Sequence, residues 1–444
     1  MKHEFIVPEI ITRFMAVFKN KDYRIYIVGG ALRELLRGFS PSNWDFTTNA
    51  TPEQIQQLFA DNFYHNEYGT VTVKYENNLF EVTPFRTEED YTDLRHPQKI
   101  TWAKNIEEDL ARRDFTINAI AFDGRELIDP HHGIADIKEK IIRAVGDPDK
   151  RFSEDALRLM RAVRIATEVE FTIEDKTRAA LMKNSYLLAK ISKERVRDEL
   201  FKILKSDYAA DGILLLKNTG LLAHIIPELD YAFSIPQKSP GRHHIYDVGT
   251  HLVMSLKSCR AKDPIVRLAV LLHDIGKPAT FKKDEKTGLI TFFNHEVAGG
   301  HLVKKIAHDL RLSTTEKNRL FTLVRFHQFT VSELQTDKAI RRFIRDVGKE
   351  NLTDMLILRD ADRIGSGAKP TSWRYELFKK RLVEVQKEPF QITDLKIDGN
   401  DVMKTLHLKP GPRVGQILQK LFNEVVEKKL KNEREILLKK LKTF

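Results

Sequence analysis

Asn43, Asp45 and Glu81 could together bind divalent cations. The first two lie in "SNWDFTTNA" and the third in "LFEVTPF". Side chains at positions i and i+2 of a β-strand face the same side, and a neighbouring strand could add Glu81. Closely spaced carboxylates hold the two ions that phosphoryl transfer between nucleotides needs, one at the attacking hydroxyl and one at the leaving pyrophosphate. Asn43 departs from this pattern, because its amide oxygen can coordinate a cation but carries no negative charge.

A second element of this chemistry is the Gly29-Gly30 pair, which follows "YRIYIV" and precedes "ALRELLRG". Glycines at a strand-to-helix turn let the backbone approach a triphosphate, and the next helix points its amino terminus at the phosphates. Arg33 would add a positive charge there. A tight turn without a ligand would need the same glycines, so the pattern alone leaves both interpretations open.

The elements that must position these residues fall into two zones. Between Tyr23 and about Ile142, short β-rich segments alternate with helical ones and predict a mixed α/β unit. From about Ser153 onward, apolar residues recur at spacings of three and four and predict a helical array, with a strand signal only near "GLITFF". Breaks rich in Pro and Gly at 234–244 and 366–372 are the expected boundaries within it.

Composition favours a partner that carries phosphates. The 444 residues suggest roughly three compact units. Lys and Arg outnumber Asp and Glu by 74 to 63, and the net charge is +11. The excess is uneven, since 11 Lys and Arg face 4 Glu from Lys404 to the end. Nucleic-acid binding explains such a stretch, and so does a solvated basic surface without a dedicated partner.

The compartment follows from cysteine and hydropathy patterns. Cys259 is the only cysteine, so the chain forms no internal disulfide. The start, "MKHEFIVPEIITRFMAVFKN", mixes charges with apolar residues and predicts an amphipathic helix, not a signal peptide. No apolar run approaches the ~18 residues of a membrane span. The sequence therefore predicts a cytoplasmic protein that does not enter a membrane.

An ordered series of motifs resembles the bacterial class II tRNA nucleotidyltransferases, the CCA-adding enzymes and their poly(A) polymerase relatives. The motifs are "VGGALRELLRG", "WDFTTNATPEQ", "EEDLARRDFTINAIA", "RFSEDALRLMRAVR" and "ISKERVRDELFKIL". The resemblance implies an α+β protein with a polymerase-beta-like nucleotidyltransferase head of mixed sheet and helices, followed by helical regions. The expected domains are a head at 1–145, a nucleotide-selecting neck at 146–235, an HD domain at 236–370 and a basic, tRNA-binding tail at 371–444.

The resemblance also implies an activity, which is template-independent addition of CCA to tRNA 3′ ends from CTP and ATP with two Mg²⁺ ions. Most members carry Asp-x-Asp where this chain has Asn43 and Asp45, so catalysis is expected to be slowed or abolished. A full-length loop between Glu81 and Asp109 favours CCA over CC addition. The alternatives are a CC-adding enzyme, a poly(A) polymerase, an HD phosphohydrolase on RNA ends with an inactive head, and a non-catalytic RNA-binding protein.

Nucleotide choice is assigned to "SEDALRLMRAVR". Asp155 and Arg158 would offer an acceptor beside donors, which match the edges of cytosine and adenine and reject those of guanine and uracil. A purely structural interpretation makes Ser153 the cap of one helix, with Arg158 paired to Asp155. By resemblance, Arg112, Arg161 and Arg164 bind the triphosphate.

The helical half carries a second group of metal-ligand residue types. They lie in "THLVMSLKS", "LLHDIGKPATF", "FNHEVAGGH", "VRFHQF" and "LRDADRIGSG", and the residues are His251, His273, Asp274, His295, His327 and Asp362. Adjacent His and Asp on a helix, joined by further His and a distant Asp, can hold a divalent ion that activates water for phosphoester hydrolysis. Each histidine alone could be a surface or core residue. Together they resemble an HD phosphohydrolase domain with a possible divalent metal.

Overall fold

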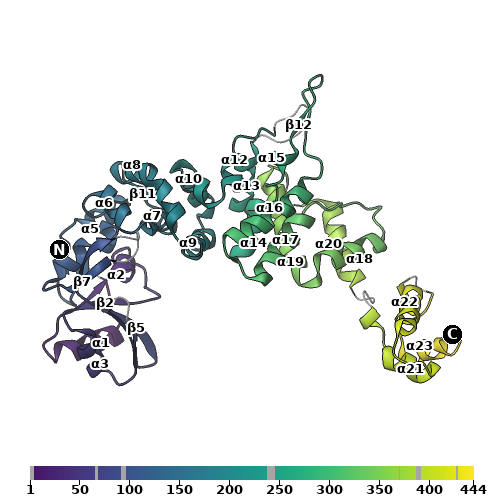
Figure 1. Cartoon of the computed structure of the whole chain (residues 1–444), viewed down its shortest axis with the longest axis horizontal. Coiled ribbons are helices and arrows are strands. Elements are labelled where there is room, and N and C mark those ends of the chain that lie inside the picture. Colours follow the sequence, from purple (N-terminus) through teal and green to yellow (C-terminus); the bar gives the residue numbers. More distant parts are fainter. Residues whose placement is uncertain are drawn as a thin grey trace.

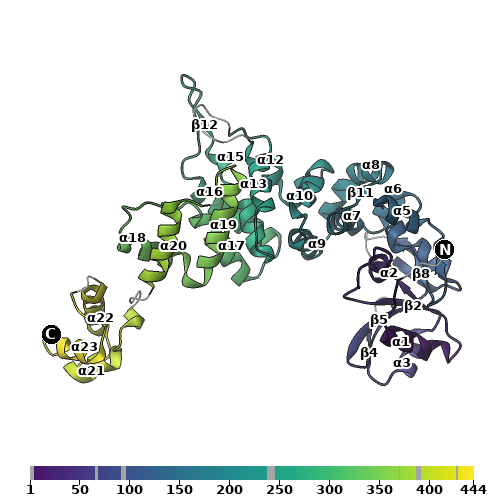
Figure 2. The same cartoon turned by 180° about the vertical axis from the view of Figure 1, so that it is seen from behind.

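The computed structural model describes residues 5–65, 69–91, 97–237, 246–369, 371–386, 392–426 and 429–444. The chain extends as an arc (Figure 1), with a sheet-containing unit at the amino-terminal end and helices along the rest. Figure 2 shows the same order from behind. The α+β fold class expected from the sequence is confirmed, with a mixed sheet in the first zone and a helical array in the second.

The amino-terminal unit is built on a seven-stranded mixed sheet with strand order β3-β4-β5-β2-β1-β8-β9. Within it, β2 and β5 run parallel and the other neighbouring strands run antiparallel. The strands are β1 (Ile25–Val28), β2 (Asp45–Thr48), β3 (Asn62–His65), β4 (Thr70–Tyr75), β5 (Asn78–Pro84), β8 (Ala121–Phe122) and β9 (Leu127–Ile128).

Aromatic packing holds the first helix on this sheet. The predicted amphipathic helix is α1 (Glu9–Lys19), whose Phe14 ring lies 4.9 Å from that of Phe46 and 4.6 Å from that of Phe80. Such rings bury large apolar areas, so α1 fixes β2 against β5. Two more helices follow strands, α2 (Gly29–Leu36) after β1 and α3 (Pro52–Leu58) after β2.

The segment between the sheet and the helical half is more structured than a single loop. Its elements are β6 (Arg86–Tyr91), β7 (Pro97–Trp102), α4 (Ile106–Ala111), the short 3₁₀ turn η1 (Thr116–Asn118), α5 (Gly133–Glu139) and β10 (Ile141–Ile142). The strands β6 and β7 form an antiparallel ribbon within the loop expected between Glu81 and Asp109. The predicted strand in "TINAIAFDG" is a strand only at Ala121–Phe122, because the chain first makes the η1 turn.

The remaining elements are almost all helices, as predicted. Up to Ala232 they are α6 (Pro148–Glu154), α7 (Leu157–Val169), β11 (Thr172–Ile173), α8 (Asp175–Asn184), η2 (Ser185–Lys190), α9 (Lys193–Lys205), α10 (Ala209–Asn218), α11 (Leu222–Ile225) and α12 (Pro227–Ala232). The next group comprises α13 (Val248–Lys257), α14 (Pro264–Leu272), α15 (Lys277–Thr280), β12 (Lys282–Lys283), β13 (Ile290–Thr291), α16 (His295–Asp309), α17 (Thr314–Phe326), α18 (Asp337–Val347), η3 (Lys349–Asn351), α19 (Leu352–Gly365) and α20 (Trp373–Val385).

The last helices have a core of their own. They are η4 (Ile392–Asp394), α21 (Gly399–Leu406), α22 (Pro412–Val426) and α23 (Arg434–Leu441), and buried residues such as Val402, Leu421 and Leu437 pack together there. By contrast, Tyr375 and Phe378 of α20 belong to the large core that runs through the rest of the chain. No described helix is long and apolar enough to cross a membrane. The three boundaries between the four domains expected from the sequence stay predictions.

Candidate active site

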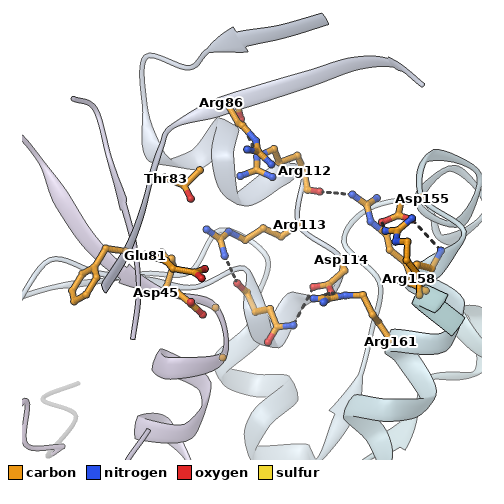
Figure 3. Close-up of a pocket in the computed structure, with 17 residues that line it drawn as sticks. Asp45, Glu81, Thr83, Arg86, Arg112, Arg113, Asp114, Asp155, Arg158 and Arg161 are labelled. Carbon is orange, nitrogen blue, oxygen red and sulfur yellow. Dashed lines mark hydrogen bonds and ion pairs between the residues drawn. The ribbon is translucent and has the colours of Figure 1, made fainter. Parts of the chain in front are cut away.

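Strand register places Asp45 beside Glu81. Asp45 opens β2 and is paired with Glu81 on one side and with Val28 on the other. Both carboxylates line a cavity of about 480 Å³ (Figure 3), at the end opposite Asp155 and Arg158. Burial, and next the charge of Glu81, raise the pKa of Asp45. Asp45 and Glu81 therefore present two adjacent carboxylates, a donor set whose charge a divalent cation would stabilise.

Asn43 does not lie in the cavity beside Asp45 and Glu81. It lies in an exposed bend two residues before β2, and the side chains that line the cavity do not include it. The expectation that residues 43 and 45 share one face of a strand was wrong, because the strand begins only at Asp45. A role for Asn43 as a metal ligand therefore stays a prediction.

Gly29 lies close to the side chains of Asp45 and Arg113. Its backbone is in the left-handed region at φ 65°, and a Cβ there would lie 3.4 Å from Asp45 Oδ2 and 3.4 Å from an Arg113 nitrogen. Glycine thus suits both the turn and the space beside the carboxylate. Gly30 also lines the cavity.

Arg33 has a different place from the one expected. It is buried, donates to Asn118 Oδ1 at 2.6 Å and to Glu34 at 3.1 Å, and does not line the cavity. The α2 helix directs its guanidinium inward, so the charge supports Asn118 instead of facing the cavity directly.

A fully buried carboxylate orients two arginines of the cavity wall. Asp109 Oδ1 accepts from Arg112 Nη2 at 2.7 Å, and Asp109 Oδ2 accepts from Arg113 Nη2 at 2.9 Å. Burial by itself would raise the pKa of Asp109, but Arg112 and Arg113 outweigh it and hold that pKa below its ordinary value. The sequence singled out Arg112 and missed Arg113, although both stand in "ARRDFT".

Asp114 organises the opposite wall. Its Oδ2 accepts from Arg161 Nε at 2.8 Å and from Nη2 at 2.5 Å, and its Oδ1 accepts from Asn118 Nδ2 at 3.0 Å. Burial by itself would raise the pKa of Asp114, but Arg161 and Asn118 stabilise the carboxylate and hold that pKa well below its ordinary range. Arg161 is thereby held at the cavity, and its binding of the triphosphate stays a prediction. No sequence pattern indicated the partner role of Asp114.

Asp155 lies at a break between the helices α6 and α7, and Arg158 lies in the first turn of α7. The expected single helix capped by Ser153 was wrong: α6 ends at Glu154, and Asp155 Oδ1 accepts from the Leu157 amide at 3.0 Å as α7 begins. Nor does Arg158 pair with Asp155. Its guanidinium donates to Glu154 at 2.8 Å and to the carbonyl oxygens of Arg151 and Arg112.

The two side chains nevertheless line the same end of the cavity (Figure 3). Arg195, which reaches this end from α9, has Nη2 3.5 Å from Asp155 Oδ2. The sequence did not single out Arg195, because nothing local in "ISKERVRDEL" indicates which residue faces a distant helix break.

Comparison with known proteins assigns the family. The poly A polymerase head domain matches residues 25–143, the probable RNA and SrmB-binding site of polymerase A matches 170–233, and a putative tRNA nucleotidyltransferase domain 2 matches 282–441. An A-adding tRNA nucleotidyltransferase of Deinococcus radiodurans is 34% identical over 409 residues, 89% of this chain and 90% of the relative. The chain belongs to the tRNA nucleotidyltransferase family.

Two further tRNA nucleotidyltransferases extend this comparison. A CCA-adding enzyme of Lactobacillus helveticus is 45% identical over 220 residues, so the alignment spans 48% of this chain and about half, 55%, of the relative. The structure of the Bacillus stearothermophilus CCA-adding enzyme in complex with CTP has a TM-score of 0.71 and 27% identity, and the match covers 98% of this chain and 97% of that one.

One family-based expectation is not met in the tRNA nucleotidyltransferase pocket. Arg164, expected at the triphosphate, donates to Glu199 of α9 at 2.5 Å and to Glu168 at 2.7 Å, and does not line the cavity. On α7 it lies one turn beyond Arg161, which places it against α9. Its charge therefore joins α7 to α9.

The six residues of the expected second metal site come together. His251 lies on α13, His273 and Asp274 follow α14, His295 opens α16, His327 follows α17 and Asp362 lies on α19. His251, His273, Asp274, His295 and His327 are buried. The expectation that His273 and Asp274 lie on a helix was wrong, because α14 ends at Leu272 and the pair sits in the turn that follows.

This cluster concentrates negative charge at its centre. Burial by itself would lower the pKa of His273, but Asp274 and Asp362 outweigh it and raise that pKa to about 10. The ammonium of Lys277 also lies 2.5 Å from Asp274 Oδ2. Buried carboxylates are stabilised by nearby cationic groups such as Lys277, so the cluster favours a bound positive charge.

Proposed function

We propose that this chain adds CCA to the 3′ end of tRNA, using CTP and ATP and releasing pyrophosphate. The observation that carries the proposal is the cavity in which paired carboxylates lie at one end and Asp155 and Arg158 at the other, with arginines between them. The likeness to the CTP-bound CCA-adding enzyme along nearly the whole chain supports it. The setting would be the cytoplasm, where tRNA and nucleotides are available.

The residues at the carboxylate end fit divalent cations. Asp45 and Glu81 would hold Mg²⁺, which supplies charge neutralisation for the attacking 3′ oxygen and the leaving pyrophosphate. Gly29 and Gly30 leave room for the triphosphate against the backbone. Arg112, Arg113 and Arg161 would then bind its oxygens, since Asp109 and Asp114 already fix their guanidinium groups near the cavity.

The other end would select the base. Cytosine and adenine both offer an amino donor beside a ring-nitrogen acceptor, whereas guanine and uracil offer a carbonyl beside an N–H. Asp155 would accept from the amino group and Arg158 would donate to the ring nitrogen. Because Glu154 and two backbone carbonyls orient Arg158, its donors are positioned before a nucleotide arrives.

Addition of A alone is the second candidate. The Deinococcus radiodurans relative that aligns with most of this chain is an A-adding enzyme. An A-adding enzyme would use the same carboxylates and triphosphate arginines and would differ in which tRNA ends it accepts. Substrate ends, and not cavity residues, therefore separate the two candidates.

The test uses three tRNA transcripts that end before the CCA, after the first C and after both Cs. Each is incubated with CTP, with ATP and with both, and product length is read on a sequencing gel. We expect all three to reach the full CCA end when both nucleotides are present. Asp45→Ala, which removes a proposed metal ligand, is the control and should abolish extension.

Other products would replace the proposal. Extension only of the transcript that ends in CC, and only by one A, would assign A addition. Products that stop at CC would indicate a CC-adding enzyme, and long A tails a poly(A) polymerase. No extension of any transcript would shift the assignment to the hydrolase or RNA-binding alternatives.

A further inference from the structure

We infer that a small pocket on the helical body, walled by α19, α20 and the turn after α13, binds a guanine base of the RNA that this chain holds. The pocket has a volume of about 200 Å³ and lies in the middle part of the arc (Figure 1). It shares no residue with the nucleotide cavity or with the His/Asp cluster. The RNA part of the inference rests on the proposed function, whereas the recognition of guanine does not.

One face of α19 forms a wall of the pocket. Ile357, Asp360 and Ile364 all line it, and their spacing of three and four residues places them in one row along the helix. Asp362, the residue of this helix that belongs to the cluster, is two positions from Asp360 and so lies about 200° around the helix axis from it. The pocket therefore presents one carboxylate between two apolar side chains, on the opposite face of α19 from the cluster.

The carboxylate of Asp360 has an unused acceptor. Its Oδ1 is shielded from solvent and has no hydrogen-bond partner among the described residues. Burial, and next the charge of Asp360, raise the pKa of Tyr375, whose hydroxyl donates to the Leu356 carbonyl oxygen at 3.3 Å. A buried acceptor without a donor is unfavourable, so a ligand that brings an N–H group to Oδ1 gains a hydrogen bond without a further desolvation cost at that atom.

Two cationic side chains also line the pocket. Arg260 is exposed and forms no ion pair with a described residue. Lys379 Nζ lies 3.2 Å from Oε1 of the exposed Glu376, a surface pair that contributes little. The pocket thus offers cationic donors together with one free acceptor. A neutral ligand that carries both acceptors and N–H donors matches this set better than an anion, which Asp360 would repel.

Guanine has that combination of groups. Its O6 and N7 atoms accept hydrogen bonds, and arginine or lysine is their commonest partner. Next to O6 lie N1–H and the N2 amino group, two adjacent donors that suit a carboxylate. Adenine and cytosine have an unprotonated ring nitrogen where guanine has N1–H, and uracil lacks the amino group. The volume is below the ~300–1,000 Å³ of a site for a drug-sized ligand and suits a single base.

RNA is the source of guanine that the surroundings favour. Lys257 and Lys380, each next in sequence to a residue of the pocket, are exposed. Such charges contact the phosphates on either side of a bound base. Bases in single-stranded loops of RNA can leave the stack and enter a protein pocket. A free guanine nucleotide carries the same base, and the experiment below separates the two sources.

Ligand-observed NMR tests the recognition of guanine. Guanosine is the probe, because it has no phosphate for the arginines of the nucleotide cavity. We expect saturation transfer to guanosine and binding at least ~10-fold weaker for 1-methylguanosine, which lacks N1–H. Asp360→Asn should weaken the binding of guanosine to a similar extent. Asp346→Asn, which removes an exposed carboxylate on α18, is the matched control and should bind guanosine as the parent does.

A second variant separates loss of the site from loss of the fold. Arg260→Gln changes an exposed side chain, so it should leave the thermal unfolding temperature unchanged and still weaken the binding of guanosine. No binding of guanosine to the parent, or equal binding by the parent and by both variants, would overturn the inference. Binding of glycine in place of guanosine would also overturn it and make the pocket a site for an amino-acid zwitterion.

Photocrosslinking tests the source of the base. A tRNA transcript that contains 6-thioguanosine is irradiated on the protein, and the crosslinked peptides are identified by mass spectrometry. We expect crosslinks within 257–260 or 371–380, because sulfur replaces O6, and fewer of them in Asp360→Asn. Binding of guanosine without such crosslinks would overturn RNA as the source and leave a free guanine nucleotide. Binding of guanosine by a chain that extends no tRNA would overturn the proposed function and leave the guanine pocket.

Discussion

Asn43 stands where the resemblance to the family leads us to expect the first carboxylate of an Asp-x-Asp pair. Asp45 and Glu81 retain two negative charges in the cavity, while Asn43 stands in an exposed bend just before β2. An incoming triphosphate would carry one ion with it, whereas an ion at the attacking 3′ hydroxyl would have to be held by residues of the chain such as Asp45 and Glu81. A missing carboxylate should therefore affect the chemical step more than nucleotide binding.

Asn43→Asp should raise kcat for nucleotide addition at least ~100-fold, on the scale of a lost electrostatic stabiliser of ~2.7 kcal/mol or more. Nucleotide affinity should change little. Single-turnover extension of a tRNA transcript measures both quantities. The control is Ser42→Asp, which adds the same charge one residue away in the same exposed bend. If the parent already works at a normal rate and Asn43→Asp adds nothing, Asn43 is not part of the metal site.

At the scale of elements, α4 and the residues after it show how a buried charge shapes the cavity. Asp109 lies within this short helix, has no exposed surface and holds both Arg112 and Arg113. Because its pKa is below the ordinary value, the interaction stabilises the fold fully above pH ~4, the pKa of an unfolded Asp. That stability is lost as the pH falls through the lower, folded-state pKa.

Asp109→Asn should therefore lower the free energy of unfolding at pH 7 by ~1.5–3 kcal/mol, the scale of hydrogen bonds to charged groups. It should also raise KM for CTP and ATP, since both arginines lose their orientation. Urea titrations from pH 7 to pH 3 should show that wild type and variant converge in acid. Glu107→Gln, on an exposed position of the same helix, should do neither. A stability difference that persists unchanged at pH 3 would contradict this account.

Whether a segment forms a helix or a strand was more predictable from the sequence than where helices break and which side chains contact each other. Runs such as "YRIYIV" and "TVTVKY" form strands as predicted, because alternation and burial are local properties. The break between α6 and α7 was not visible, since apolar spacing continues across Asp155 and the cause is a side-chain contact to the Leu157 amide. Similarly, the partners of Arg33 and Arg164 were not predictable, because the orientation of a guanidinium depends on which helix packs against it.

At the scale of the whole molecule, the carboxy-terminal helices form a separable unit. Their core is independent of the large one, and they carry much of the basic excess. Lys404, Lys409 and Arg413 are exposed around the junction of α21 and α22. If such charges contact tRNA phosphates, binding should release counterions and weaken as salt rises.

Deleting residues 392–444 should weaken tRNA binding and flatten the slope of log affinity against log salt, by about 0.7–0.9 for each phosphate that the deleted segment neutralises. Filter binding at several salt concentrations gives the slope. The triple variant Lys404→Ala/Lys409→Ala/Arg413→Ala leaves the core residues in place and should shift it in the same direction. Slopes identical to wild type in both proteins would assign these charges to plain solvation.

The single cysteine, Cys259, makes it practical to measure the distance between the two ends of the molecule with attached dyes. Cys259 is buried, and burial raises the pKa of its thiol, so little reactive thiolate forms. Maleimide dyes should therefore react selectively with cysteines introduced on the surface of α3 and of α22, without first mutating the native one. Energy transfer between the dyes would then report in real time how far the sheet-bearing end and the carboxy-terminal helices approach each other while an RNA is held.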